Sequence, residues 1–288
     1  MNIGYLYFLL PVIFLSATGI IHVAIGRKIG AKKLSLYRQI TLMIIGSPLL
    51  FGLLNKTDLI EKHILLLIAS GIVGTGYLLL SFHAMNITSV GISKSFLAVS
   101  RTISSFCIGF FLLQEAINIY DIFGMLIIFL GFYILGKVNR EKLTQNDIKG
   151  ITVSLLAGVV FSINILIFKI YAADFTALES AYLLESMNAI FLVIFSIFYG
   201  KNKLQDKFKI PLKTFFVLCL VSPLVLVGIY GLAMSVNLIP FYIFNTGFIF
   251  ILIVSTILGW IFLKEKFSLG RGISLGIMII GSMMMIVL

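Results

Sequence analysis

The sequence has 288 residues, of which 60% are hydrophobic and only 11% are charged. A soluble domain carries about 25% charged residues, so this composition argues against a soluble enzyme, a nucleic-acid binder and a disordered chain. The net charge of +11 is better explained by loop lysines that face an anionic cytoplasmic leaflet.

Ten apolar runs follow one another along the chain, at approximately 3–25, 34–54, 64–82, 88–113, 118–136, 150–171, 176–199, 212–234, 236–262 and 268–288. A hydrocarbon core of about 30 Å requires about 20 helical residues. Backbone amides cannot stay unpaired in lipid, and these runs are too long and too continuously apolar for barrel strands. The first run has neither a basic segment before it nor a cleavage site after it, so we expect a span and not a signal peptide. The sequence thus predicts an all-α integral membrane protein with ten transmembrane helices.

Basic residues lie almost entirely on one set of loops. Seventeen of the 22 lysines and arginines lie in or beside the loops that follow the odd-numbered runs. The opposite loops hold only Lys56 and Lys62, while Lys94, Arg101 and Lys169 lie within runs. The positive-inside rule places the more basic loops in the cytoplasm. We therefore expect a multi-pass protein of the cell membrane whose two termini face away from the cytoplasm.

The most polar long loop runs from Lys137 to Gly150 and divides the chain into five runs and five. With an odd number of spans in each half, two similar halves must have opposite orientations in the membrane, as in the inverted repeats of many transporters. The sequence predicts a first five-helix repeat at 1–137, a connecting loop at 138–149 and a second five-helix repeat at 150–288.

Sequence matches between the halves support this division. At an offset of 150, Leu113, Glu115, Ile127 and Gly131 correspond to Leu263, Glu265, Ile277 and Gly281. At an offset of 149, Ala84 and Met85 correspond to Ala233 and Met234, and at an offset of 146, Leu9, Leu10 and Ser16 correspond to Leu155, Leu156 and Ser162. The glutamate match is the most informative, because the chain has only 11 acidic residues.

The matched glutamates and glycines also mark a family. Glu115 and Glu265 follow the fourth helix of each half, and Gly131 and Gly281 lie further on. Weaker marks are the run AMNITSVG from Ala84, Arg38 in the second helix, and Asn164 with Lys169 in the sixth. With these marks, each half resembles an EamA domain of the drug/metabolite transporter superfamily. The resemblance implies ten helices, a central cavity between the halves and alternating access.

The chain departs from the family pattern at three points. The middle of the fourth helix, from Ala98 to Thr102, lacks the proline that is common there in the family. Glu185 occupies the position of the second half that corresponds to Arg38. Many family members are described with cytoplasmic termini, whereas the charges of this chain predict the reverse orientation.

Ionisable residues deep within a span cost about 2.5–3.5 kcal/mol on insertion scales, so each requires an explanation. Arg101 lies midway along the fourth run, and Lys94 lies on the same face two turns earlier. They are candidates to bind a substrate carboxylate or phosphate, although Lys94 can also snorkel. Glu185, about nine residues into the seventh run, is a candidate for proton coupling. We expect Arg101 and Glu185 to face the cavity from opposite halves and to form an ion pair when it is empty; a purely structural pair is the alternative.

The other substrate-site candidates are polar residues near apolar helix centres or helix ends. They are Arg38, Asn164, Tyr182, Tyr242 and Asn245. Arg38 has interface anchoring as its alternative role, and the asparagines can instead form interhelical hydrogen bonds. Lys169 is expected to snorkel, and Glu115 and Glu265 to cap helices or order loops. His22 and His83 show no metal-ligand spacing, so no metal or cofactor is expected.

A secondary transporter is the function that the sequence favours. It is expected to move a small polar metabolite, with an amino acid or organic anion favoured, across the cytoplasmic membrane by alternating access, with proton coupling as an option. The alternatives are an exporter of cationic drugs or metabolites and a non-transporting membrane assembly protein. The sequence contains neither a clustered catalytic pair, which an enzyme would need, nor a Walker motif, which a nucleotide-driven pump would need. It leaves the oligomeric state open.

Overall fold

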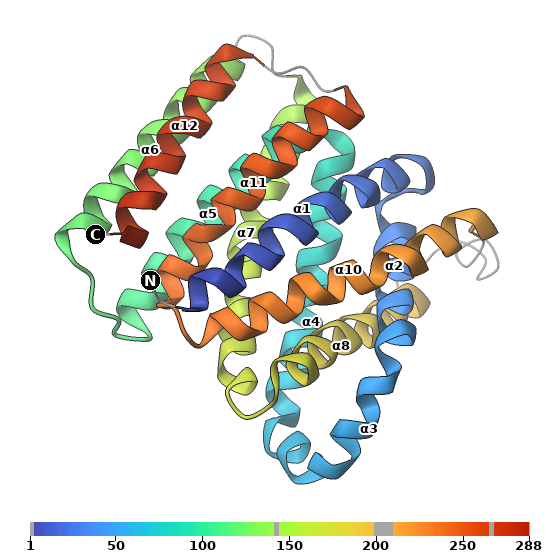
Figure 1. Cartoon of the computed structure of the whole chain (residues 1–288). Helices are drawn as coiled ribbons and strands as arrows, with labels where there is room; N and C mark the ends of the chain where they lie inside the picture. Colours follow the sequence, from blue (N-terminus) through green and yellow to red (C-terminus); the bar gives the residue numbers. More distant parts are fainter. Residues whose placement is uncertain (1–2, 141–143, 199–209, 265–267, 288) are drawn as a thin grey trace.

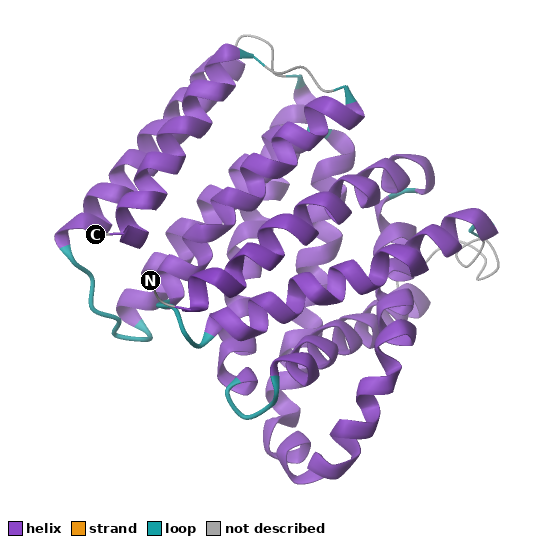
Figure 2. Ribbon diagram, viewed as in Figure 1, coloured by secondary structure: helices purple, strands orange, loops and turns teal. Residues whose placement is uncertain are grey.

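The computed structural model describes residues 3–140, 144–198, 210–264 and 268–287, and this part of the chain is helical without strands (Figures 1 and 2). Its long helices are α1 (Ile3–Ile29), α2 (Ala31–Gly46), α4 (Thr57–Ile87), α5 (Val90–Phe111), α6 (Ile119–Arg140), α7 (Gln145–Ala172), α8 (Ala177–Phe198), α10 (Leu212–Val236), α11 (Phe241–Leu263) and α12 (Leu269–Val287). Three short turns, η1 (Ser47–Leu49), α3 (Leu50–Leu53) and η2 (Leu54–Lys56), connect α2 to α4. The predicted all-α class is confirmed.

Seven helical stretches of the described residues are long and apolar enough to cross a membrane. One of them, Ala31–Ile87, contains both α2 and α4, and Ile119–Leu135 forms a shorter apolar helix. Helix α5 is not among the seven; it carries Lys94, Arg101 and several serines, which lower its hydropathy. The chain is therefore a multi-pass membrane protein, while the count of ten spans stays a prediction.

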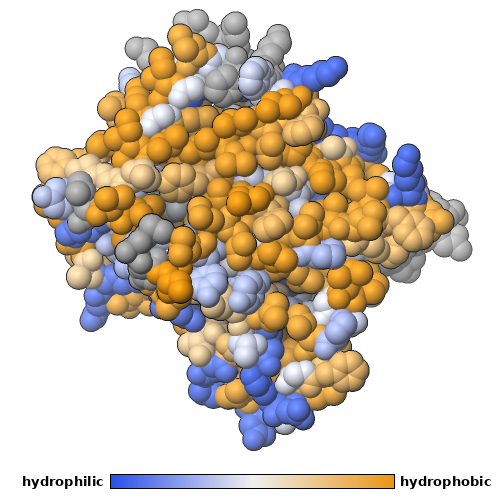
Figure 3. All heavy atoms as spheres, in the orientation of Figure 1, coloured by the Kyte–Doolittle hydropathy of each residue, from blue (hydrophilic) through white to orange (hydrophobic). Residues whose placement is uncertain are grey.

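The helices run between two ends of the bundle. At one end, the connections from α1 to α2 and from α4 to α5 lie together with Arg27, Lys28, Lys32 and Lys33; we call this the basic end (Figure 1). At the other end, which we call the terminal end, both chain termini lie with the α5–α6 and α7–α8 connections. Apolar side chains dominate the surface between the ends (Figure 3), with Leu65 and Leu220 more than three-quarters exposed. Such a surface suits contact with lipid.

Helices of the first half pack mainly on helices of the second half. Helix α4 packs on α7 and α10 packs on α1, while α5 and α11 contact each other and also pack on α7 and α1 respectively. Helices α2 and α8 are neighbours, and α6 pairs with α12 at one side of the molecule (Figure 1). Because helices of the two halves alternate in this packing, both halves border the space at the centre of the bundle.

Small residues bring α6 and α12 close together. A Cβ added to Gly281 would lie 2.5 Å from the carbonyl oxygen of Gly124, and one added to Gly131 would lie 2.9 Å from that of Ser274. The Ser274 hydroxyl donates to the Gly131 carbonyl at 2.6 Å. Gly131 and Gly281, which match at an offset of 150, thus allow close backbone packing between the last helices of the two halves.

Candidate functional site

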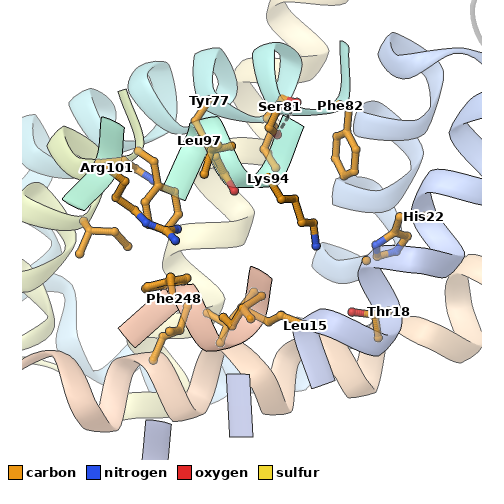
Figure 4. Close-up of a pocket in the computed structure, with 18 of the residues that line it drawn as sticks. Leu15, Thr18, His22, Tyr77, Ser81, Phe82, Lys94, Leu97, Arg101 and Phe248 are labelled. Atoms are coloured by element: carbon orange, nitrogen blue, oxygen red, sulfur yellow. Dashed lines mark hydrogen bonds between the residues drawn. The ribbon is translucent and has the colours of Figure 1, made fainter. Parts of the chain in front are cut away.

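A cavity of about 170 Å³ lies at the centre of the bundle, between helices of both halves (Figure 4). Its walls are largely apolar, and a few polar residues converge on it. The polar lining residues are Thr18, His22, Arg38, Tyr77, Ser81, Lys94, Arg101, Asn164, Glu185 and Asn188. An apolar pocket with few convergent polar groups is the usual form of a small-molecule site.

Five of the eight predicted site residues line this cavity: Arg38, Lys94, Arg101, Asn164 and Glu185. They come from α2, α5, α7 and α8, which are distant in sequence. The structure therefore brings these candidates together, and their role in substrate binding stays a prediction.

Arg101 is only 4% exposed and extends from α5 into the cavity (Figure 4). Its Cζ atom lies 3.9 Å from the ring centroid of Phe248 and 4.8 Å from that of Phe161. The described residues provide no hydrogen-bond partner for its Nε and no ion pair for its guanidinium. The expected pairing with Glu185 is therefore not found, and aromatic rings take the place of a carboxylate.

Glu185 is paired with Arg38 instead. Two guanidinium nitrogens of Arg38 donate to the two carboxylate oxygens, each at 3.4 Å, and the amide nitrogen of Gln39 donates to the same carboxylate. All three side chains are buried. The interface position considered for Arg38 is thus wrong, because this arginine lies inside the bundle. Arg38 and Glu185 occupy corresponding positions of the two halves. Their ion pair therefore lies at the contact between α2 and α8, where the two halves pack together.

Lys94 also reaches into the cavity. Its ammonium donates to the Ser255 hydroxyl of α11 at 2.7 Å, and a Cβ on Gly19 of α1 would lie 3.2 Å from it. The side chain of Lys94 is directed toward the open space near His22 (Figure 4). It therefore contributes positive charge to the cavity.

The remaining three candidates lie outside the cavity lining. Tyr182 packs against Gly46 of α2, where an added Cβ would lie 2.6 Å from its ring. The Tyr242 hydroxyl donates to Asp121 of α6 at 2.9 Å. The Asn245 amide donates to the carbonyl of Phe241 at 2.9 Å within its own helix. These contacts connect helices or occupy a helix turn, and none of the three side chains borders the cavity.

Several lining residues were not among the predicted site residues. They include His22 and three aromatic residues of apolar helices, Tyr77, Phe161 and Phe248. Asn188 could have been found, because it lies one turn after Glu185 and shares its helix face. The aromatic residues could not, since nothing in an apolar run of this composition separates a cavity-facing ring from a lipid-facing one.

Polar contacts between the halves gather at the terminal end. Lys56 pairs with Glu179 at 2.7 Å, and Lys62 donates to Asp174 at 2.7 Å. The ring of His63 contacts the same Asp174 oxygen at 2.7 Å. The hydrogen bonds from Lys62 and His63 lower the pKa of the Asp174 carboxyl from its ordinary value, so these pairs hold this carboxyl in its charged form.

Glu115 provides a further link between the halves at this end. One of its carboxylate oxygens accepts the backbone N–H of Phe241 at 2.7 Å, and Lys169 lies 3.7 Å from it. A carboxylate at a helix N-terminus satisfies an otherwise unpaired donor, so Glu115 caps α11 of the opposite half. The geometry agrees with the capping role expected for Glu115, and Lys169 pairs with Glu115 where snorkelling was expected. Glu265, its expected counterpart, lies outside the described residues.

The described residues contain no group of three His, Cys, Asp or Glu side chains able to hold a metal ion. What the cavity offers chemically is positive charge in an apolar surrounding. That arrangement can bind and orient an anionic group.

Three comparisons place the chain among known proteins. The model of the EamA-like transporter family matches residues 2–137, which confirms the resemblance for the first half of the chain. Fifteen chains of solved structures match, and one of them, described only as a crystal structure of a protein, has a TM-score of 0.68. Its sequence is 14% identical, and the match covers 98% of this chain and 94% of that one, so the two share a fold. No curated protein matches.

Proposed function

We propose, on the premise that this chain is an EamA-like membrane protein of the drug/metabolite transporter superfamily, that it is a secondary transporter for a small metabolite with an anionic group. The substrate binds in the central cavity between two inverted five-helix repeats, which together cross the membrane ten times. Arg101 binds the anionic group, and Glu185 takes part in proton coupling.

Two corresponding hydrogen bonds support the repeats. The Ser16 hydroxyl of α1 donates to the carbonyl of Ile251 at 3.2 Å, and the Ser162 hydroxyl of α7 donates to the carbonyl of Arg101 at 3.1 Å. Ser16 corresponds to Ser162 at an offset of 146, and Arg101 corresponds to Ile251 at an offset of 150. Exchanging the two halves therefore converts one hydrogen bond into the other.

Helix packing follows the same exchange. When the five helices of one half are replaced in order by those of the other, the α4–α7 contact becomes the α10–α1 contact, and α5–α7 becomes α11–α1. The pairs α6–α12, α5–α11 and α2–α8 are converted into themselves. An approximate two-fold axis through the bundle centre accounts for both sets of contacts.

The observation that carries the function is the buried charge of Arg101. Its guanidinium lines the cavity, is 4% exposed and has no acidic partner among the described residues. A substrate anion would supply the missing negative charge. A cationic substrate is disfavoured, because Glu185 is the acidic residue of the lining and is already bound by Arg38.

The arrangement of polar contacts supports alternating access. The terminal end is closed by the pairs between the halves described above. The cavity instead extends toward the basic end, since Thr18 and His22 of α1, Ser81 and Met85 of α4, and Lys94 of α5 all lie in the helix halves next to that end. With the basic end in the cytoplasm, we infer an inward-facing state.

A binding screen followed by flux tests this function. Purified protein should be stabilised against heat by at least one anionic or zwitterionic metabolite in a panel of amino acids and organic acids, since a ligand at 100 times its Kd adds about 2.7 kcal/mol. Proteoliposomes should then take up that compound, and empty liposomes should not. A panel in which only cationic compounds stabilise the protein would refute the anionic substrate class.

Orientation gives an independent prediction. Both termini should face away from the cytoplasm, because the loops of the basic end carry most lysines and arginines. A fusion of alkaline phosphatase to the C-terminus should be active, and a green fluorescent protein fusion should be dark. The control is the same pair of fusions placed after Lys142, in the loop predicted to be cytoplasmic, where the outcome should be reversed. Fluorescence at the C-terminus would overturn the orientation.

A further inference from the structure

We propose that Phe248 couples the charge of Arg101 to the closure of the terminal end. This inference rests on the proposed transport function and adds a positioning residue to it. Phe248 contacts Arg101 and also packs against Phe8 and Phe244, which lie toward the terminal end. It thereby connects the substrate site with the region that must open for substrate to reach that side.

Arg101 lies in a corner formed by two aromatic rings of the second half. The rings of Phe161 and Phe248 have centroids 5.2 Å apart and planes at 77°, and the Arg101 Cζ lies above both of them. Because Arg101 belongs to α5, these cation–π contacts hold the first half against α7 and α11. In a desolvated site, such contacts are strongest while the guanidinium keeps its full charge.

Phe248 also packs on two phenylalanines that lie nearer the terminal end, Phe8 and Phe244, and we call these three rings the aromatic plug. Phe8 of α1 lies 5.3 Å from Phe244 and 5.4 Å from Phe248, and the two α11 rings lie 5.6 Å apart. Phe8 and Phe244 are within two turns of the ends at which α1 and α11 begin. A Cβ on Gly247 would lie 2.9 Å from the Phe8 ring, so the packing of α1 on α11 is close here.

Binding of an anion weakens the contact that holds the plug. The anion neutralises the guanidinium, and a neutralised ion pair is attracted less to the quadrupole of the Phe248 ring than a bare cation is. The ligand therefore favours the state in which the Arg101–Phe248 contact is broken. Such a difference in affinity between two states is what any ligand-driven change requires.

Labelling without a ligand tests the coupling. In a Cys107→Ser/Cys219→Ser background, Leu252→Cys places a thiol in the cavity lining, one turn beyond Phe248. A membrane-impermeant maleimide is applied from the terminal side of sealed vesicles. Arg101→Gln, which mimics neutralisation, and Phe248→Leu, which removes the ring quadrupole, should each raise the labelling rate about three- to tenfold, as loss of a desolvated cation–π contact permits.

Matched variants isolate the charge. Arg101→Lys keeps a cation and should label close to the parent rate, and Phe96→Leu removes another aromatic contact of α5, with Phe132, and should also leave the rate unchanged. In the Phe248→Leu background, Arg101→Gln should add less than twofold. The coupling is refuted if Arg101→Gln leaves the labelling rate unchanged, or if Arg101→Lys raises the rate as much as Arg101→Gln does. It is also refuted if the effects of Arg101→Gln and Phe248→Leu multiply in the double variant. These readouts need no substrate, so failure of the metabolite screen would refute transport separately.

Discussion

Replacing Arg101 with glutamine is expected to remove substrate binding while making the empty protein more stable. Truncating one partner of a buried, hydrogen-bonded charge pair weakens binding by about 2–5 kcal/mol, which is roughly 30-fold or more in Kd. Without ligand, Arg101 has no acidic partner among the described residues. A charge at this depth opposes insertion by about 2.5–3.5 kcal/mol, which exceeds the roughly 2 kcal/mol that the contact of Arg101 with the aromatic rings contributes. Thermal unfolding with and without the metabolite found in the screen measures both effects.

The two readouts together separate a binding role from a structural one. If Arg101 were mainly structural, Arg101→Gln would lower the unfolding temperature of the empty protein and leave ligand affinity nearly unchanged. Arg101→Lys serves as the control, because it keeps the charge but loses the planar guanidinium. It should retain measurable but weaker binding. Unchanged affinity in Arg101→Gln would move the site elsewhere in the cavity, with Asn164 and Lys94 as the next candidates.

Breaking the Arg38–Glu185 pair is expected to have the largest effect on stability. Both side chains are buried, and removing one partner of a buried ion pair is destabilising by about 3–5 kcal/mol, since it leaves an uncompensated charge. Glu185→Gln should therefore lower the unfolding temperature strongly. The charge swap Arg38→Glu/Glu185→Arg should recover most of the loss, because the two residues occupy corresponding positions on neighbouring helices. A swap no more stable than Glu185→Gln would contradict this.

The role of Glu185 in proton coupling must be tested in a variant that still folds, because Glu185→Gln alone is expected to be unstable. The double substitution Arg38→Gln/Glu185→Gln removes both charges, and loss of an entire buried pair is often nearly neutral for stability. We expect it to bind the metabolite but to transport it at a rate that no longer varies between pH 5.5 and pH 8. Flux in proteoliposomes at each pH measures this, with Lys62→Gln at the terminal end as the control. A pH profile like that of the parent would exclude Glu185 from coupling.

The amino-acid sequence by itself determined the class of the protein. Continuous apolar runs leave helices as the spanning structure, because unpaired backbone groups are not tolerated in lipid. The same reading located deep charges, since each is conspicuous against an apolar background, and Arg38, Lys94, Arg101, Asn164 and Glu185 do line one cavity. The sequence match of Ser16 with Ser162 also aligned α1 with α7 correctly, because these two serines donate corresponding hydrogen bonds.

Only the tertiary structure decided which of these groups are partners. Sequence placed Arg101 and Glu185 at similar depth and favoured their pairing, yet Glu185 contacts Arg38, and Arg101 contacts Phe161 and Phe248. Depth follows from position along a helix, but partners depend on how each helix is rotated about its axis. Helix α11, which carries Phe248, is apolar on nearly all sides and so has no hydrophobic stripe to fix that rotation. It is set by close packing at small residues and by interhelical hydrogen bonds, which form only once helices from both halves are assembled.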